Sequence, residues 1–318
     1  MKEALLEINN LCVDYVSPNG VARAVNKVSL TIKPGETLGI AGESGCGKST
    51  LAFAITRLHK APGLIPEGEI LYNGRDVLKM SDKELRDYRW NDVSIVFQSA
   101  MNSLNPVITI GEQLIDVILA HKPVTYKEAA EKAEELLGIV GIHGDRMKSF
   151  PHQLSGGMRQ RVVIAIALAL EPKLIIMDEP TTALDVVVER EILNELYDLK
   201  EQFGFSILFI SHDLSLMGEI ADRIGVMYAG NLIEIGDAKT VFSKPSHPYT
   251  KGLIASFPTI HGPKERLYGI PGDPVNLLRL PIGCNFQDRC SECMDICKNK
   301  DPMLAELSDG YQAACHGL

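Results

Sequence analysis

The segment Gly42-Glu43-Ser44-Gly45-Cys46-Gly47-Lys48-Ser49 decides the fold class, because it fits the phosphate-loop pattern G-x-x-x-x-G-K-[ST]. An apolar strand is predicted before it, over residues 36–41, and a helix after it, over residues 48–59, as the pattern requires. Glycines let backbone N–H groups turn towards phosphate oxygens, and the helix N-terminus adds positive dipole. Lys48 is expected to reach the β- and γ-phosphates, and Ser49 to ligate Mg²⁺. The segment therefore predicts a binding site for nucleotide phosphates with Mg²⁺.

A second acidic site is predicted at the end of another apolar strand, over residues 174–177. Such a strand delivers Asp178 to the carboxyl edge of the sheet, where ligands bind in doubly wound folds. Glu179 follows directly and is placed to polarise an attacking water, a role typically worth about 10²- to 10⁴-fold in rate. An Asp-Glu pair after a strand is by itself often only a solvated loop. Together with the phosphate loop, it indicates nucleotide hydrolysis.

The remaining pattern alternates strands with helices, which predicts an α/β fold with a mainly parallel sheet covered on both faces. Asn73-Gly74 is a strong hairpin signal, and Gly204 is expected to end a helix. The other predicted elements are strands over 5–13, 24–32 and 205–210, a mostly helical stretch over 106–170 that includes 126–140, a helix over 187–203 and a β pair around 229–231.

Composition excludes several classes of protein. The chain has 318 residues, with 32 Lys and Arg against 41 Asp and Glu, so no nucleic-acid partner bound through a broad basic face is expected. The longest apolar run, Val162–Leu170, is half the length that a membrane crossing needs, and the first ten residues have no signal-like stretch. Seven of the 17 prolines lie between residues 245 and 281. We therefore predict an ATPase domain over 1–235 and a small C-terminal module over 236–318.

A third motif lies between the phosphate loop and the acidic pair Asp178-Glu179. Its sequence, Leu154-Ser155-Gly156-Gly157-Met158, resembles the LSGGQ signature of the ATP-binding-cassette (ABC) ATPases, with Met158 in place of Gln. The resemblance implies a P-loop NTPase nucleotide-binding domain with a RecA-like core, an antiparallel β subdomain and a helical subdomain at about 100–165. In that family the signature closes on the γ-phosphate held by a partner subunit. A second ABC ATPase subunit, identical or a paralogue, is therefore implied in a head-to-tail dimer.

The resemblance also implies roles for four further residues. Tyr15 resembles the aromatic residue that stacks on adenine, and Gln98 the glutamine that contacts Mg²⁺ and water. Asp185 resembles the aspartate that crosses the dimer interface, and His212 the histidine that contacts the γ-phosphate. The implied catalytic residues are Glu179, His212 and Gln98, the Mg²⁺ ligands are Ser49, Gln98 and Asp178, and the nucleotide contacts add Tyr15, Gly42, Ser44, Gly45, Cys46, Gly47, Lys48, Thr50, Ser155, Gly156, Gly157 and Asp185.

Two strings indicate the branch of the family. Residues 97–106, FQSAMNSLNP, resemble the FQDPM-x-SLNP segment of dipeptide and oligopeptide importer ATPases, with Ser99-Ala100 in place of Asp-Pro. Residues 246–251, SHPYTK, resemble their HPYT segment. The resemblance implies an ATP hydrolase that is peripheral at the cytoplasmic face of the cell membrane and powers peptide import through two integral membrane permease subunits fed by an extracytoplasmic peptide-binding protein. Nickel or metal-chelate importers share these strings, and a soluble non-transport ABC ATPase is the third alternative.

Five of the seven cysteines lie between residues 284 and 315. The importer subfamily has a matching pattern at Cys284, Cys290, Cys297 and Cys315, which leaves Cys293 as an extra thiol. Four thiolates suit either a [4Fe–4S] cluster or tetrahedral Zn²⁺, and the irregular spacing favours the cluster. Unligated thiols in a small core are the alternative. The hypothesis is a structural metal, whereas a redox-regulatory role has only the thiols to support it.

Overall fold

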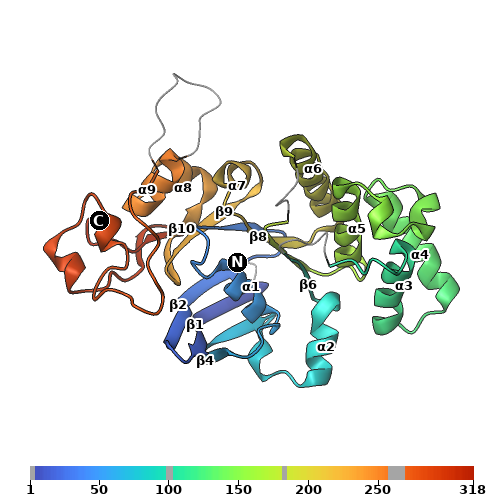
Figure 1. The fold of residues 1–318 in the computed structure, drawn as a ribbon, viewed down its shortest axis with the longest axis horizontal. Helices are drawn as coiled ribbons and strands as arrows, with labels where there is room; N and C mark the ends of the chain where they lie inside the picture. The colour runs from blue at the N-terminus through green and yellow to red at the C-terminus, as the bar shows by residue number, and fades with distance from the viewer. Residues whose placement is uncertain (1–3, 98–102, 181–184, 257–268) are drawn as a thin grey trace. The chain divides into compact units, whose positions relative to one another are not determined.

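The computed structural model describes residues 4–97, 103–180, 185–256 and 269–318, and the chain divides into two compact units. Unit 1 contains Met1–Leu78 and Phe209–Leu318, and unit 2 contains Lys79–Leu208. Figure 1 labels their helices and strands. Among the helices of the described ranges, none combines the length and the apolar character that a bilayer crossing requires.

Unit 1 contains a four-stranded antiparallel sheet in the order β2-β1-β4-β5. Figure 1 shows β1, β2 and β4 side by side. The predicted hairpin at Asn73-Gly74 is confirmed, because both residues have positive φ, 46° and 75°, between β4 and β5. The strands are β1 (Leu6–Ser17), β2 (Gly20–Ile32), β4 (Gly63–Tyr72) and β5 (Arg75–Asp76), followed by the 3₁₀ helix η1 (Val77–Lys79).

A second run of strands in unit 1 has the order β11-β12-β10-β9-β3. The pair β3·β9 is parallel, whereas β9·β10, β10·β12 and β11·β12 are antiparallel. The strands are β3 (Thr37–Ala41), β9 (Arg223–Tyr228), β10 (Asn231–Asp237), β11 (Ala305–Ser308) and β12 (Tyr311–Ala313). The helices are α1 (Lys48–Ile55), α7 (Leu214–Ile220), α8 (Ala238–Ser243) and α9 (Pro248–Ala255), with 3₁₀ helices η5 (Gln287–Arg289) and η6 (Asp295–Lys298).

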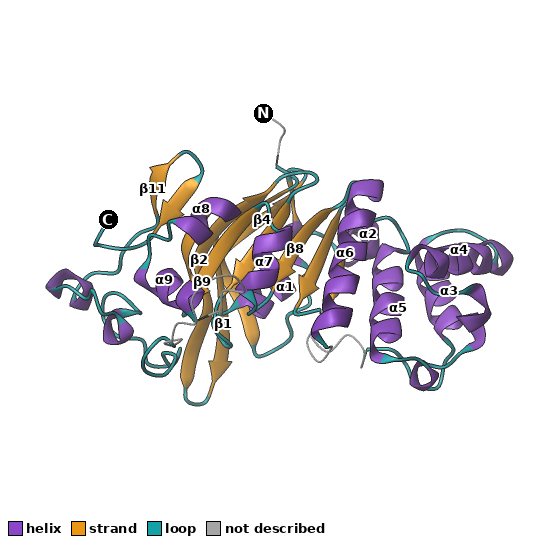
Figure 2. Ribbon diagram, turned by 90° about the horizontal axis from the view of Figure 1, so that it is seen from above, coloured by secondary structure: helices purple, strands orange, loops and turns teal. Residues whose placement is uncertain are grey.

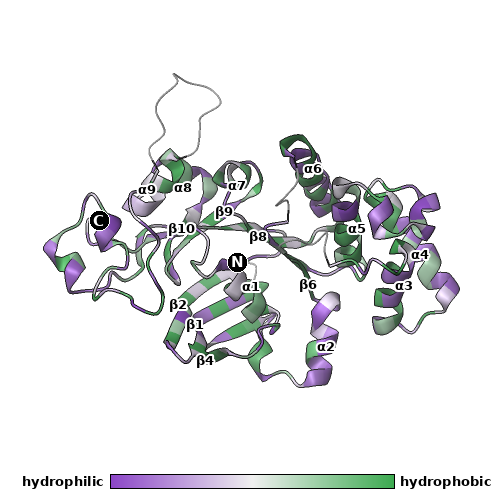
Figure 3. Cartoon of the chain, viewed as in Figure 1, coloured by the Kyte–Doolittle hydropathy of each residue, from purple (hydrophilic) through white to green (hydrophobic). Residues whose placement is uncertain are grey.

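Unit 2 is largely helical, and its parallel pair β6·β7 agrees with the predicted parallel sheet. Figure 2 shows α3, α4 and α5 grouped together, and Figure 3 shows α5 in the green of apolar residues, whereas α2 and α4 carry much purple. Its elements are α2 (Asp82–Asn91), β6 (Val93–Val96), α3 (Ile110–His121), α4 (Tyr126–Ile139), η3 (Gly144–Lys148), η4 (Pro151–Gln153), α5 (Gly156–Leu168), β7 (Leu174–Asp178) and α6 (Val186–Phe203), and β8 (Ser206–Ile210) runs from unit 2 into unit 1.

Most predicted elements are confirmed, with shifted ends. The helix after the phosphate loop was predicted to reach residue 59 but ends at Ile55, because Arg57 adopts a left-handed backbone (φ 49°). Gly204 ends α6 in a left-handed conformation, as predicted. The sequence reasoning did not find α2, although Ser81 and Glu84 form a capping box at its start. It also did not find the β11–β12 hairpin.

A buried carboxylate connects the C-terminal hairpin to the sheet of unit 1. Glu234 on β10 has no solvent exposure, and it accepts hydrogen bonds from the backbone N–H groups of Ser246 and His247. The Tyr311 hydroxyl on β12 donates to the same carboxylate at 2.6 Å. Burial and then this hydrogen bond raise the pKa of Tyr311 to about 12, so the hydroxyl keeps its proton. One carboxylate thus holds β10, β12 and the segment before α9 together.

Substitution of Tyr311→Phe should lower the free energy of unfolding by about 2 kcal/mol, because it removes a hydrogen bond to a buried charge. Urea unfolding of the full chain measures the change. Ser308→Ala, which removes an exposed hydroxyl from the same hairpin, serves as the control and should have little effect. Equal stability of Tyr311→Phe and wild type would contradict the assigned role of Glu234.

Candidate nucleotide-binding site

The phosphate loop connects the buried strand β3 to helix α1, as the sequence predicts. Gly42 and Gly47 have positive φ values of 148° and 109°. A Cβ at Gly42 would clash with the carbonyl oxygen of Met227, and one at Gly47 with that of Ala24. Both positions therefore require glycine for the backbone angle and for the close approach of other backbone atoms.

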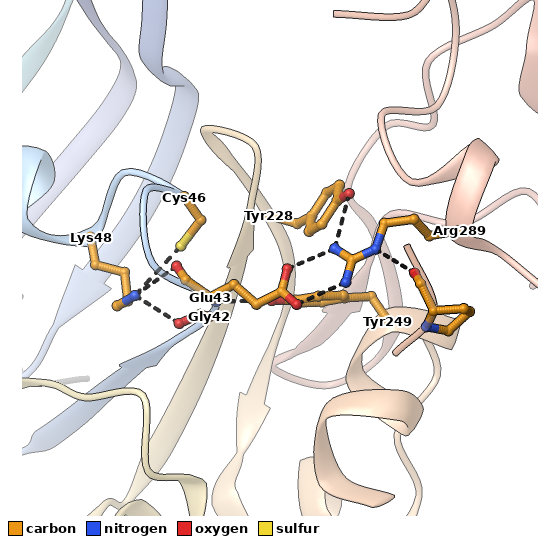
Figure 4. Close-up of polar contacts among 8 residues, drawn as sticks. Gly42, Glu43, Cys46, Lys48, Tyr228, Tyr249 and Arg289 are labelled. Atoms are coloured by element: carbon orange, nitrogen blue, oxygen red, sulfur yellow. Dashed lines mark hydrogen bonds and ion pairs between the residues drawn. The ribbon is translucent and has the colours of Figure 1, made fainter. Parts of the chain in front are cut away.

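Lys48, the lysine of the loop, is buried and folds back over the loop backbone. Its Nζ donates to the carbonyl oxygens of Gly42 at 2.7 Å and Glu43 at 3.0 Å. Figure 4 shows Nζ also facing the thiol of Cys46, 3.7 Å away. Burial raises the pKa of the Cys46 thiol, against the opposing effect of Lys48. Cys46 is therefore a neutral, buried neighbour of the cation.

Tyr15, on β1, lies beside the start of α1. Its hydroxyl is 3.5 Å from the hydroxyl of Thr50, the residue after Ser49. The structure thus brings Tyr15 to the phosphate-loop helix, which is the neighbourhood that the adenine-stacking prediction requires. The stacking role itself stays a prediction.

His212, also in unit 1, follows β8 and is exposed. The next residue, Asp213, caps α7 by accepting the backbone N–H of Ser215 at 2.8 Å. His212 therefore lies directly before the N-cap of α7, which fixes the backbone that follows it. Its predicted contact with a γ-phosphate stays a prediction.

In unit 2, Asp178 is the last residue of β7 and is 1% exposed. Glu179 follows it with a φ of 47°, a left-handed conformation that is uncommon outside glycine. Such backbone strain often occurs at functional sites, where surrounding structure imposes it. The predicted roles of these residues, metal ligation and water activation, stay predictions.

The signature segment and Asp185 are positioned as helix caps in unit 2. Ser155 accepts the N–H of Met158 at 3.3 Å and starts α5, with Gly156 and Gly157 in its first turn. Asp185 accepts the N–H of Val188 at 3.0 Å and starts α6. The helix N-terminus predicted at the signature is therefore present. Gln98 and the Ser99-Ala100 departure lie outside the described residues.

The described residues do not support the metal site that the sequence predicts at the C-terminus. Cys284, Cys290, Cys297 and Cys315 all line one small cavity. Yet among the residues that the structure describes, no group of three or more His, Cys, Asp or Glu side chains is arranged to hold a metal ion. In the absence of a metal, burial raises the pKa of Cys284 to about 11 and also raises that of Cys290. The prediction of a [4Fe–4S] cluster or Zn²⁺ is not supported.

Sequence reasoning missed the residues that contact the phosphate loop from the C-terminal part of unit 1. Arg289 forms a bidentate ion pair with Glu43, and the Tyr249 hydroxyl accepts the N–H of Glu43. Tyr249 lies in the HPYT segment, and Arg289 directly precedes Cys290. Neither string contains a signal for a partner in the phosphate loop.

A buried strand, a glycine loop with its lysine, and the helix that follows define unit 1 as the phosphate-binding part of a P-loop NTPase. Residues 25–182 match the family model described as ABC transporter, and residues 233–297 match the one described as oligopeptide/dipeptide transporter, C-terminal region.

Known proteins of this kind are similar to this chain over almost its whole length. This chain is 46% identical to the oligopeptide transport ATP-binding protein OppD of Salmonella typhimurium, over 98% of this chain and 93% of the relative. It is 42% identical to the dipeptide transport ATP-binding protein DppD of Bacillus subtilis, covering 98% and 94%. A solved dimeric structure of the ATP-binding cassette MJ0796, bound to ADP and phosphate, superposes with a TM-score of 0.65 at 31% identity over 73% of this chain and 98% of that one.

The chain therefore belongs to the ABC transporter ATPase family, in the branch that carries the oligopeptide/dipeptide transporter C-terminal region. It has the ABC nucleotide-binding fold that the signature resemblance implied, and its nucleotide and metal are ATP and Mg²⁺. The phosphate loop fits that metal, because Ser49 places a hydroxyl oxygen in the first turn of α1, the kind of atom that Mg²⁺ prefers as a ligand.

Substitution of Gly47→Ala should abolish ATP binding, because the new Cβ collides with backbone and the φ of 109° strains any other residue. Titration of the full chain with a fluorescent ATP analogue measures the affinity. Gly74→Ala is the matched control, since Gly74 also has positive φ but open space around it. It should cost about 1 kcal/mol of stability and leave ATP affinity unchanged. Normal affinity of Gly47→Ala would contradict the loop geometry.

Proposed function

We propose that this chain is the ATP-hydrolysing subunit that powers import of dipeptides and oligopeptides through a membrane permease complex. The observation that carries the proposal is the combination, in one chain, of a complete phosphate loop with the oligopeptide/dipeptide transporter C-terminal region. The names of its relatives, oligopeptide and dipeptide transport ATP-binding proteins, support the same substrate class.

The residues of the nucleotide site take the roles that the family resemblance implies. Lys48 binds the β- and γ-phosphates, Tyr15 stacks on adenine and His212 contacts the γ-phosphate. Ser49 and Asp178 hold Mg²⁺, which when bound neutralises charge on the phosphate oxygens. Glu179 accepts a proton from the attacking water. The buried position of Asp178 and the strained backbone of Glu179 support these assignments.

The proposed assembly follows from the signature segment. The chain has one phosphate loop and one signature, so two complete sites need a second ABC ATPase subunit with Ser155 and Asp185 acting across the dimer. The dimeric state of the MJ0796 cassette supports this arrangement. The remaining partners are two permease subunits and an extracytoplasmic peptide-binding protein. The ATPase part, residues 1–235, works peripherally at the cytoplasmic face, and residues 236–318 form the C-terminal module.

The other transported substrate considered, nickel or a metal chelate, has weaker support. The C-terminal family model and the relatives cited above are described by peptides rather than by metals. A DNA- or ribosome-binding ABC ATPase is disfavoured by the net charge of −9 and by the peptide-transporter C-terminal region.

Substitution of Glu179→Gln should leave ATP binding intact but lower hydrolysis by about 10²- to 10⁴-fold, because the water loses its base. Uptake of a labelled tripeptide by proteoliposomes holding the co-purified complex should stop. Glu201→Gln, an exposed position on α6, is the control and should match wild type.

Three results would count against this proposal. Rapid steady hydrolysis by Glu179→Gln would remove Glu179 as the base. Uptake of nickel but not of tripeptide by the wild-type complex would replace the peptide substrate, and purification without any permease would reject the transport function.

A metal at the C-terminal cysteines stays a prediction of the sequence. Its support is that Cys284, Cys290, Cys297 and Cys315 line one cavity. Against it stands the lack, within the described ranges, of any group placed to ligate a metal.

Iron and zinc analysis of anaerobically purified chain decides between metal and free thiols. From the geometry we expect neither iron nor zinc in stoichiometric amount. A quantitative thiol assay of the native protein should detect free thiols. Stoichiometric iron with visible absorption that is lost in Cys290→Ser, but kept in Cys293→Ser, would restore the cluster assignment.

A further inference from the structure

The second residue of the phosphate loop, Glu43, is held by a residue from the far end of the chain. Arg289 Nη1 lies 2.7 Å from Oε2 of Glu43, and Arg289 Nη2 lies 2.8 Å from Oε1. The guanidinium therefore contacts both carboxylate oxygens in a bidentate arrangement (Figure 4). This geometry fixes the direction of the Glu43 side chain as well as its distance.

Arg289 is itself fixed on its other sides. Its Nε donates to the carbonyl oxygen of Pro271 at 2.8 Å, and its Nη1 lies 3.4 Å from the Tyr228 hydroxyl. The guanidinium lies over the rings of Tyr228 and Phe286, 5.8 and 5.9 Å from their centres. Its side chain is 6% exposed, and the hydrogen bond to Glu43 raises the Arg289 pKa against the opposing effect of burial. A permanently charged, rigid donor thus faces the loop.

The backbone of Glu43 is held from the same direction. Its N–H donates to the hydroxyl of Tyr249 at 2.9 Å. Tyr249 is fully buried at the start of α9, and its ring packs on Tyr228 and Phe286 at 4.7 and 5.4 Å between centres. Burial raises the pKa of Tyr249, so the hydroxyl remains protonated. Side chain and backbone of one loop residue are both anchored to the C-terminal part of unit 1.

The charge of Glu43 explains why the anchor matters for ATP. A carboxylate within a loop that binds a triphosphate repels the ligand unless a cation neutralises it. Figure 4 shows Lys48 and Arg289 on opposite sides of Glu43, with the carboxylate directed towards Arg289 and away from Lys48. The carbonyl groups that receive the Lys48 ammonium belong to Gly42 and Glu43. A shift of Glu43 therefore also moves the contacts of Lys48, the lysine of the phosphate loop.

We propose that Arg289 is a positioning residue for ATP binding, acting through Glu43. It neutralises and orients the Glu43 carboxylate, so the folded cysteine-bearing segment sets the affinity of the phosphate loop for nucleotide. The inference rests on the ATPase activity of the chain and not on peptide import. It assigns the C-terminal region a role in the nucleotide site of the same subunit.

A double-mutant cycle on the full chain tests the proposal. Arg289→Gln leaves Glu43 charged and unpaired, so the Kd for a fluorescent ATP analogue should rise about ten-fold, equivalent to about 1.4 kcal/mol. Glu43→Gln removes the charge and should bind within about three-fold of wild type. In the double variant, Arg289→Gln should have little further effect, because no carboxylate remains to be neutralised. Steady-state hydrolysis should show the loss in KM, with kcat nearly unchanged.

The controls separate this role from a general effect on folding. Lys251→Gln removes the cation of an exposed ion pair with Glu292 in the same region and should leave Kd unchanged. Thermal unfolding without nucleotide reports stability independently of affinity. If Arg289→Gln does not fold, Arg289→Lys is the second variant, because it keeps the positive charge but cannot make the bidentate contact with Glu43. It should raise the Kd several-fold when residue 43 is Glu. It should leave the Kd unchanged when residue 43 is Gln.

Two outcomes would overturn the proposal. The first is a Kd of folded Arg289→Gln within two-fold of wild type. The second is the same rise in Kd whether residue 43 is Glu or Gln, since an effect independent of the carboxylate cannot act through it. Loss of peptide uptake with normal ATP affinity would bear on the proposed import function instead.

Discussion

The close approach of three backbone segments at the phosphate loop is the constraint on which the rest of unit 1 depends. Gly42 lies against the carbonyl of Met227 on β9, and Gly47 against that of Ala24 on β2. The loop is therefore enclosed by strands of both sheets of unit 1, and its N–H groups keep their direction because no side chain intervenes. A loop fixed in this way binds an anion without first having to become ordered.

Features encoded over a few residues could be predicted from the sequence. Asn73-Gly74 formed the expected turn, Gly204 ended α6, and Ser155 began the helix that its signature segment implied. In each case the side chain or its absence determines the local backbone. The phosphate loop belongs to this group, which is why the sequence alone predicts both the fold class and the nucleotide site.

Other features have no local signal. The helix after the loop ends four residues early in a Schellman motif, in which Arg57 has a left-handed backbone and the N–H of Leu58 donates to the carbonyl of Phe53 at 2.8 Å; glycine is the usual residue at that position, so Arg57 gave no signal. Glu179 also has a left-handed backbone, after β7. The partner of Glu43 lies 246 positions away, so neither residue type nor spacing could identify it. The thiols show the opposite case, because their spacing indicates a metal for which the described side chains form no ligating group.

The ion pair between Glu43 and Arg289 orients the two side chains more than it stabilises the folded chain. Burying the Arg289 guanidinium, whose side chain is 6% exposed, costs solvation energy that its attraction to the 26%-exposed Glu43 carboxylate only roughly offsets, whereas an unpaired guanidinium at that place keeps the whole cost. The pair thus adds little net stability but strongly penalises any arrangement in which the two residues separate. Arg289 ends a short 3₁₀ helix whose flanking turns bring Cys284 N–H to the carbonyl of Cys297 at 2.8 Å. The same penalty therefore makes the fold of the cysteine segment and the shape of the phosphate loop depend on each other.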